Sequence, residues 1–185
     1  MTENKTGTAM GMVKTVVVLL LFAAAVAALL GLVNQVTAGP IADHQAAKTQ
    51  TAMRAVLPSK EYSQLIYDGD PMIKAVYRAG EEGWVFEVTP SGFGGLIDML
   101  VGVDTSGAVT GVSIITMSET SGLGANAARE SFRSQYVGKS VSVKLRKQGG
   151  EIDALTGATV TSTAVTNGVN AALAAAGELM KEGGL

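Results

Sequence analysis

Hydroxyl groups are concentrated in one short stretch near the end of the chain. Residues 153–165, DALTGATVTSTAV, hold five Thr or Ser side chains among small apolar residues, with no His, Cys or Lys. Before a helix, such a stretch ordinarily supplies capping residues, because Thr161 or Ser162 can accept hydrogen bonds from the first backbone N–H groups. Capping is therefore the simplest interpretation of this stretch.

The same position can also hold a phosphate. A turn that enters a helix presents free N–H groups and the positive end of the helix dipole. Gly157 and Ala158 keep this turn narrow, so the Thr159 hydroxyl is expected where a phosphate would be favoured. That hydroxyl could donate a hydrogen bond to the phosphate or carry it covalently.

The composition removes most other redox and catalytic groups. The chain has 185 residues, a net charge of −2, no Cys and a single His, His44. Disulfides, iron–sulfur clusters and thiolate zinc sites are therefore excluded, and a His cluster for a metal is absent from the sequence. The net charge gives no reason to expect nucleic acid as a partner. Redox or group-transfer chemistry would need a bound organic cofactor.

An apolar segment near the N-terminus predicts a membrane anchor. Residues 16–33 are eighteen consecutive uncharged, apolar residues, which as a helix span roughly 27 Å. A cleaved signal peptide is the alternative, since 36–40, VTAGP, offers small residues, but the apolar run exceeds a typical signal core. We therefore expect a retained transmembrane helix over 15–35.

The charges around this segment predict its orientation. Lys5 and Lys14 precede it, whereas 34–43 contains no Lys or Arg. The positive-inside rule then places residues 1–14 in the cytoplasm and 40–185 outside. The expected protein is a single-pass protein of the cytoplasmic (inner) membrane, with its main domain on the extracytoplasmic side.

The outer domain is predicted to be α+β, with a largely antiparallel sheet and flanking helices. Alternating apolar residues and a TSG turn before Ala108 indicate strands and a hairpin, and apolar stripes at helical spacing indicate helices. The predicted strands are 83–89, 95–104, 108–117 and 140–147, and the predicted helices are 41–57, 126–138 and about 162–180.

Two glycine-rich segments resemble nucleotide-binding loops only superficially. GLGANA, 122–127, fits G-x-G-x-x-A, but it lies too far from the preceding strand, and no acidic residue follows about twenty residues on. SGFGG, 91–95, lacks the Gly-Lys-Ser/Thr of a P-loop. Neither segment by itself predicts a nucleotide site.

Three motifs in a fixed order give the sequence a close resemblance to a known family. Asp153-Ala-Leu-Thr-Gly-Ala-Thr159 matches a D-x-x-[ST]-G-A-T motif, GFGG at 92–95 matches G-[YF]-G-G, and ETSGLG at 119–124 matches E-T-P-G-L-G. The chain resembles the FMN-binding subunits of Rnf and Na⁺-pumping NADH:quinone oxidoreductase complexes. Its short length is more similar to the G subunits of Rnf than to the longer C subunits. Ser121 stands where the family usually has Pro.

The resemblance implies a flavin site. Thr159 would carry FMN through a phosphoester, installed by a separate flavin transferase that takes FMN from FAD. The acceptor turn would also contain Asp153, Thr156, Gly157 and Ala158. The ETSGLG loop would lie beside the isoalloxazine ring, through Glu119, Thr120, Gly122, Leu123 and Gly124. The GFGG segment would approach the ribityl-phosphate side through Gly92, Gly94 and Gly95.

The resemblance also implies a function. The chain would relay electrons through FMN, together with other subunits of a membrane electron-transport complex that couples ferredoxin:NAD⁺ oxidoreduction to Na⁺ or H⁺ translocation. It would need no catalytic residue or metal of its own. Two alternatives stay open: a flavin relay in a Na⁺-pumping quinone reductase or an extracellular electron-transfer chain, and a membrane-tethered binding module without a cofactor.

Overall fold

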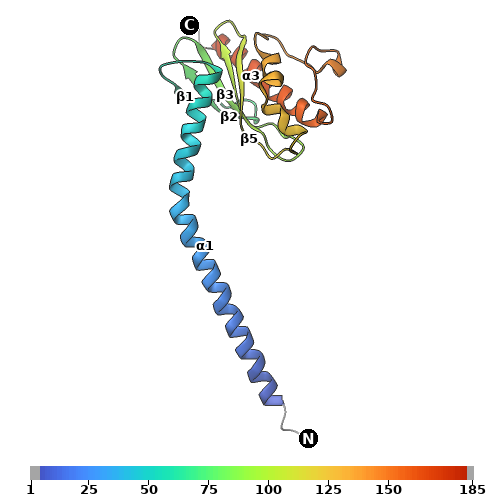
Figure 1. Cartoon of the computed structure of the whole chain (residues 1–185). Helices are drawn as coiled ribbons and strands as arrows, with labels where there is room; N and C mark the ends of the chain where they lie inside the picture. The colour runs from blue at the N-terminus through green and yellow to red at the C-terminus, as the bar shows by residue number, and fades with distance from the viewer. Residues whose placement is uncertain (1–4, 183–185) are drawn as a thin grey trace. The chain divides into compact units, whose positions relative to one another are not determined.

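The computed structural model describes residues 5–182, with side chains described for 12–39 and 47–181 (Figure 1). The chain divides into an N-terminal unit, Met1–Ala47, and a folded domain, Lys48–Leu185.

The N-terminal unit is helical. Helix α1 is assigned to Lys5–Val56 and contains a candidate membrane span, Met12–Gly39, of 28 residues; its most apolar 18-residue window has a mean hydropathy of 3.1 and exposed side chains. This stretch is long and apolar enough to cross a membrane, and it includes the predicted span over 15–35. The segment predicted as a separate helix at 41–57 belongs to the same helix, which ends just before Leu57 and Pro58.

The folded domain is built on one antiparallel sheet, so the predicted α+β class is confirmed. Its five strands follow the order β1-β2-β3-β4-β5, and each pairs with its neighbour in antiparallel register. The predicted hairpin joins β4 and β5, where Gly107 has a φ of +82° and the Asp104 carboxylate accepts hydrogen bonds from Ser106 and Ala108. The strands are β1 (Ser63–Leu65), β2 (Ile73–Ala79), β3 (Gly83–Val88), β4 (Asp98–Asp104) and β5 (Val109–Thr116).

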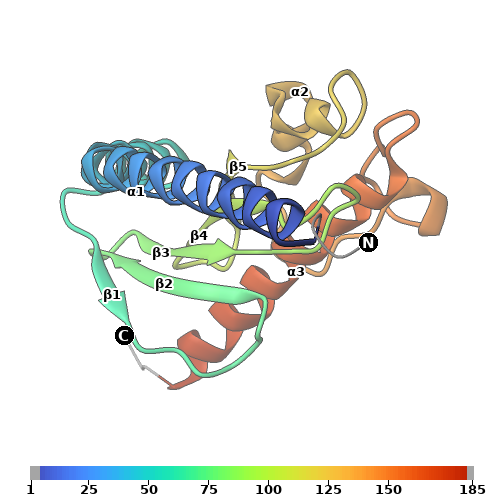
Figure 2. The same cartoon turned by 90° about the horizontal axis from the view of Figure 1, so that it is seen from below.

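Both faces of the sheet are covered. Phe86 and Val101 lie in the core under helix α3 (Thr159–Glu182), which crosses one face (Figure 2). Val85 and Leu100 point to the opposite face and pack with the last turn of α1. Alternate residues of one strand therefore enter two separate cores, as the period of a strand requires.

Two glycines let the end of α1 approach the sheet. Gly102 pairs with Gly111 in the register of β4 and β5, and a Cβ on Gly102 would lie 2.7 Å from the Val56 carbonyl oxygen. Gly102→Ala is expected to lower the free energy of unfolding by about 1–3 kcal/mol. Gly177→Ala is the matched control, because nothing lies within 4 Å of its added Cβ and alanine favours a helix interior.

Urea unfolding of the full chain in detergent measures this difference. The single tryptophan, Trp84, is 4% exposed and reports on the core. Equal stability of the Gly102→Ala and Gly177→Ala variants would contradict the close contact between α1 and the sheet.

The prediction of one continuous helix over 126–138 is wrong. The segment forms a 3₁₀ helix η1 (Gly124–Ala128), a single α turn α2 (Glu130–Arg133) and a 3₁₀ helix η2 (Ser134–Tyr136), before Gly138 at a φ of +79°. The extended backbone of Arg129, with ψ of 142°, separates the first two. Phe132 and Tyr136 are both buried, and their rings meet edge to face with centroids 5.7 Å apart. Core packing has overridden a regular helix here.

The strand predicted over 140–147 is also wrong. Within residues 5–182, this segment pairs with no strand of the sheet: Leu145 forms one isolated bridge with Ile152, and a 3₁₀ helix η3 (Arg146–Gln148) follows. The Asn170 side chain bonds both the N–H and the carbonyl of Val143, at 2.8 and 2.9 Å. An amide from α3 thus replaces the neighbouring strand, while the apolar alternation still buries Val143 and Leu145.

Candidate functional site

The hydroxyl-rich stretch folds into a tight turn that opens α3. Gly157 has a φ of +74°, which favours glycine, and the Ala158 N–H bonds to the Leu155 carbonyl at 3.0 Å. The Ser162 hydroxyl accepts the Leu155 N–H and donates to the Ala158 carbonyl, both at 2.9 Å. Helix α3 therefore begins at Thr159, three residues before its predicted start.

The five hydroxyls of this stretch have different environments. Thr161 and Ser162 are buried and hydrogen-bonded, and Thr163 donates to the Thr159 carbonyl at 2.9 Å. Thr156 and Thr159 are exposed, and within the described residues their hydroxyls make no hydrogen bond. Thr159 also lines a pocket, whereas Thr156 does not. Among these five, Thr159 is thus the exposed hydroxyl that a ligand in the pocket can reach.

The pocket lies between the start of α3 and two loops. Its volume is about 390 Å³, within the range of small-molecule sites. Three of its apolar residues are well exposed: Phe93 (73%), Val160 (52%) and Leu123 (44%). The full lining is Phe93, Glu119, Thr120, Leu123, Gly124, Gly157, Ala158, Thr159, Val160 and Thr161.

The Glu119 carboxylate joins the three segments of the pocket wall. Its Oε1 accepts the N–H groups of Phe93 and Gly94, at 2.8 and 3.0 Å, and its Oε2 accepts the Thr161 hydroxyl at 2.7 Å. A Cβ on Gly124 would lie 2.5 Å from Oε2. Glu119 therefore positions the loops and the helix rather than offering a free carboxylate.

The pocket combines two kinds of binding surface. The side chains of Phe93, Leu123 and Val160 suit a flat apolar group. The hydrogen-bond pattern of α3 begins with the Ser162 N–H, which donates to the Ala158 carbonyl at 3.0 Å. The backbone N–H groups that precede Ser162 therefore lie at the N-terminus of the helix, where an anion is stabilised. A ligand with an aromatic ring system and a phosphate fits this arrangement.

The structure brings most of the predicted site residues together. Those that line the pocket are Thr159, Gly157, Ala158, Glu119, Thr120, Leu123 and Gly124. The sequence did not predict that Phe93, Val160 and Thr161 line the pocket. The one sequence signal for any of them was the position of Phe93 inside the GFGG motif.

The other predicted residues lie outside the pocket lining, and their assignment to a flavin stays a prediction. A Cβ on Gly92 would lie 2.2 Å from Glu119 Oε1, and one on Gly94 would lie 2.1 Å from the Ser118 carbonyl oxygen. These two glycines therefore make room for protein atoms. Gly95 and Gly122 have positive φ, +143° and +78°, with open space at the missing Cβ.

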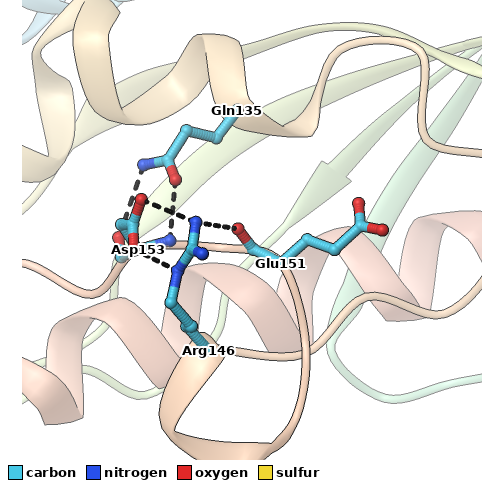
Figure 3. Close-up of polar contacts among 4 residues, drawn as sticks. All are labelled: Gln135, Arg146, Glu151 and Asp153. Carbon is cyan, nitrogen blue, oxygen red and sulfur yellow. Dashed lines mark hydrogen bonds and ion pairs between the residues drawn. The ribbon is translucent and has the colours of Figure 1, made fainter.

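Asp153 and Thr156 complete the predicted set, and both are exposed beside the turn. Asp153 forms an ion pair with Arg146, 2.6 Å between Arg146 Nε and Asp153 Oδ1 (Figure 3). This hydrogen bond and the charge of Asp153 raise the pKa of Arg146. The GLGANA segment opens η1, a 3₁₀ helix, which agrees with its rejection as a dinucleotide-binding loop.

Comparison with known proteins gives the class of the domain. Residues 92–174 match the family of the FMN-binding domain, and residues 8–56 match the RnfG N-terminal region. The folded domain is therefore an FMN-binding domain, and Thr159 and its pocket lie inside the matched residues. The chain as a whole belongs to the family of the G subunits of ion-translocating oxidoreductase complexes.

Two relatives that match over most of their length support this assignment and confirm the predicted family. The G subunit of the ion-translocating oxidoreductase complex of Methanosarcina acetivorans is 33% identical over 172 residues, covering 86% of this chain and 92% of the relative. The G subunit of the Na⁺-translocating ferredoxin:NAD⁺ oxidoreductase complex of Acetobacterium woodii is 34% identical over 178 residues, covering 83% and 86%.

The domain is also similar to a solved structure. The C subunit of the Na⁺-translocating NADH-quinone reductase of Parabacteroides distasonis aligns with a TM-score of 0.49 and 20% identity, over 69% of this chain and 80% of that chain.

The apolar stretch of α1, together with membership of an ion-translocating family, makes this chain a membrane-anchored subunit of an oxidoreductase complex.

Proposed function

We propose that this chain carries FMN as a phosphoester on Thr159 and relays electrons in an ion-translocating ferredoxin:NAD⁺ oxidoreductase complex. The observation that carries the proposal is the position of the Thr159 hydroxyl, exposed at the first residue of a 24-residue helix and in the lining of the pocket. Family membership supports the complex, and the absence of Cys from the sequence leaves electron transfer to a bound cofactor.

The attachment is a phosphoryl transfer without a change of oxidation state. The Thr159 oxygen bonds to the FMN phosphorus of FAD, and the phosphoanhydride bond to the AMP half breaks. AMP leaves, and the hydroxyl proton passes to a base of the flavin transferase or to solvent. On the side of this chain, the start of α3 stabilises the negative charge of the phosphate.

The chain's own residues would then hold the cofactor in place. Phe93 and Leu123 offer apolar surface to the ring system, and Thr120 offers a polar group at the pocket wall. FMN supplies the ability to accept and donate electrons. A phosphoester also retains the cofactor where free FMN is scarce, because its loss no longer depends on a dissociation constant.

Isolation of the native complex tests this function. In the complex purified from host membranes, the band of this 18.9 kDa subunit should fluoresce under ultraviolet light after denaturing electrophoresis. The complex should reduce NAD⁺ with reduced ferredoxin, and a Thr159→Ala complex should not. A complex that keeps full activity with a non-fluorescent subunit would contradict the proposal.

The domain that carries Thr159 is proposed to lie on the extracytoplasmic side. The support is the placement of Lys5 and Lys14 before the uncharged apolar residues 16–33. Because the chain has no Cys, single cysteines report on topology without background. Ser142→Cys should react with a membrane-impermeant maleimide in cells bounded by the intact cytoplasmic membrane, and Thr2→Cys should react only after lysis. The reverse pattern would overturn the orientation.

A further inference from the structure

We propose that Arg146 and Gln135 are positioning residues for flavin attachment: they hold Asp153, and the flavin transferase recognises residues 153–159 as the folded surface that this contact maintains. The inference rests on the proposed attachment of FMN to Thr159. It gives the Asp153 carboxylate a role within this chain, as the partner of Arg146, instead of making it the group that the transferase reads directly.

Arg146 occupies both oxygens of the Asp153 carboxylate. Its Nε donates to Oδ1 at 2.6 Å and its Nη2 donates to Oδ2 at 3.1 Å. Such a two-point contact fixes orientation as well as distance. Arg146 is itself placed by a backbone bond from its N–H to the Ile152 carbonyl at 2.8 Å. The carboxylate at the head of the motif is therefore already engaged.

Gln135 holds the backbone of the same residue. Its side-chain oxygen accepts the Asp153 N–H at 2.7 Å, and its amide nitrogen donates to the Asp153 carbonyl at 3.3 Å. Figure 3 shows Asp153 between Gln135 and Arg146. Gln135 comes from η2, so the contact ties the start of the acceptor turn to a different part of the domain.

The other end of the turn is held by α3. The Ser162 hydroxyl accepts the Leu155 N–H at 2.9 Å, and Thr159 begins the helix. Between these two anchors, Thr156 and Gly157 are exposed. A partner that binds this turn meets an ordered surface and has little conformational freedom to remove, which favours binding and reaction.

The contact is exposed, so it can be removed without unfolding the domain. Both side chains of the Arg146–Asp153 pair are 66% exposed, and exposed ion pairs contribute little to global stability. The Lys139–Glu151 pair provides a control, because its side chains, 30% and 74% exposed, form a separate ion pair and make no hydrogen bond with Asp153 among the described residues.

The experiment measures the rate of flavin attachment to the full chain in detergent micelles, with FAD and the host's flavin transferase. Arg146→Ala should lower kcat/KM of the transferase about 10- to 100-fold and leave the melting temperature unchanged, whereas Lys139→Ala should change neither. Asp153→Ala should lower kcat/KM by the same factor as Arg146→Ala. The double variant should react no more slowly than either single variant, because each substitution removes the same Arg146–Asp153 contact.

The outcomes separate this inference from the function on which it rests. A wild-type chain that takes up no flavin contradicts the proposed attachment itself. A labelled wild type with Arg146→Ala at the wild-type rate overturns the inference alone. So does an Asp153→Ala variant far slower than Arg146→Ala, because the transferase would then read the carboxylate directly.

Discussion

Thr159→Ala is expected to abolish covalent flavin attachment completely. The substitution removes the one exposed hydroxyl of the hydroxyl-rich stretch that lines the pocket. The fold should survive, because Thr159 is exposed and alanine is a good helix former. In-gel fluorescence and the intact mass of protein produced together with the transferase measure the result: a dark band and an unmodified mass.

Two neighbouring variants make this prediction specific. Thr156→Ala removes the other exposed hydroxyl and should leave the band fluorescent, because Thr156 lies outside the pocket lining. Thr159→Ser keeps an oxygen at the same place and should still be labelled. A fluorescent Thr159→Ala band would move the attachment site.

Glu119→Ala is expected to cause the largest loss of stability around the pocket. The variant loses the hydrogen bonds to Phe93, Gly94 and Thr161, and bonds to a charged group are the stronger kind. Because two of these bonds are exposed to solvent, we expect a decrease of about 2–3 kcal/mol in the free energy of unfolding. Urea unfolding followed by Trp84 fluorescence measures it.

The same variant separates attachment from positioning. Glu119→Ala keeps Thr159, so the chain should still be labelled, but the loosened loops should lower the fluorescence anisotropy of the attached flavin. Glu130→Ala is the matched control: its side chain is 80% exposed, so the loss should stay below about 1 kcal/mol. Wild-type stability and anisotropy in Glu119→Ala would show that the carboxylate does not hold the pocket together.

The sheet was predictable where strands keep a strict alternation of apolar residues. Strand β3 followed from this pattern at 83–89, whereas the hairpin of β4 and β5 followed from the TSG turn and Gly107 between two apolar segments. Strand β2 was missed because a register shift between Ile73 and Ala75 breaks its period, and β1 because it has only three residues. The false strand at 140–147 had the right alternation, but its backbone bonds are met by the Asn170 side chain.

The site shows the same division between local and tertiary information. Thr159 and the turn around Gly157 depend on adjacent residues, so a motif was sufficient to predict them. The contribution of Phe93 was missed although Phe93 lies inside the GFGG motif, because its place in the pocket depends on a loop distant in sequence from α3. The role of Glu119 was likewise hidden, because two of its partners are backbone N–H groups, which every residue except proline has.

The most direct measurement is the fragmentation mass spectrum of the tryptic peptide 148–181, from protein isolated from its own host. This peptide contains all five hydroxyls of the acceptor stretch. The predicted result is a mass increase equal to FMN minus water, assigned by backbone fragments to Thr159. An unmodified peptide, or a flavin assigned to another hydroxyl, would contradict the central claim.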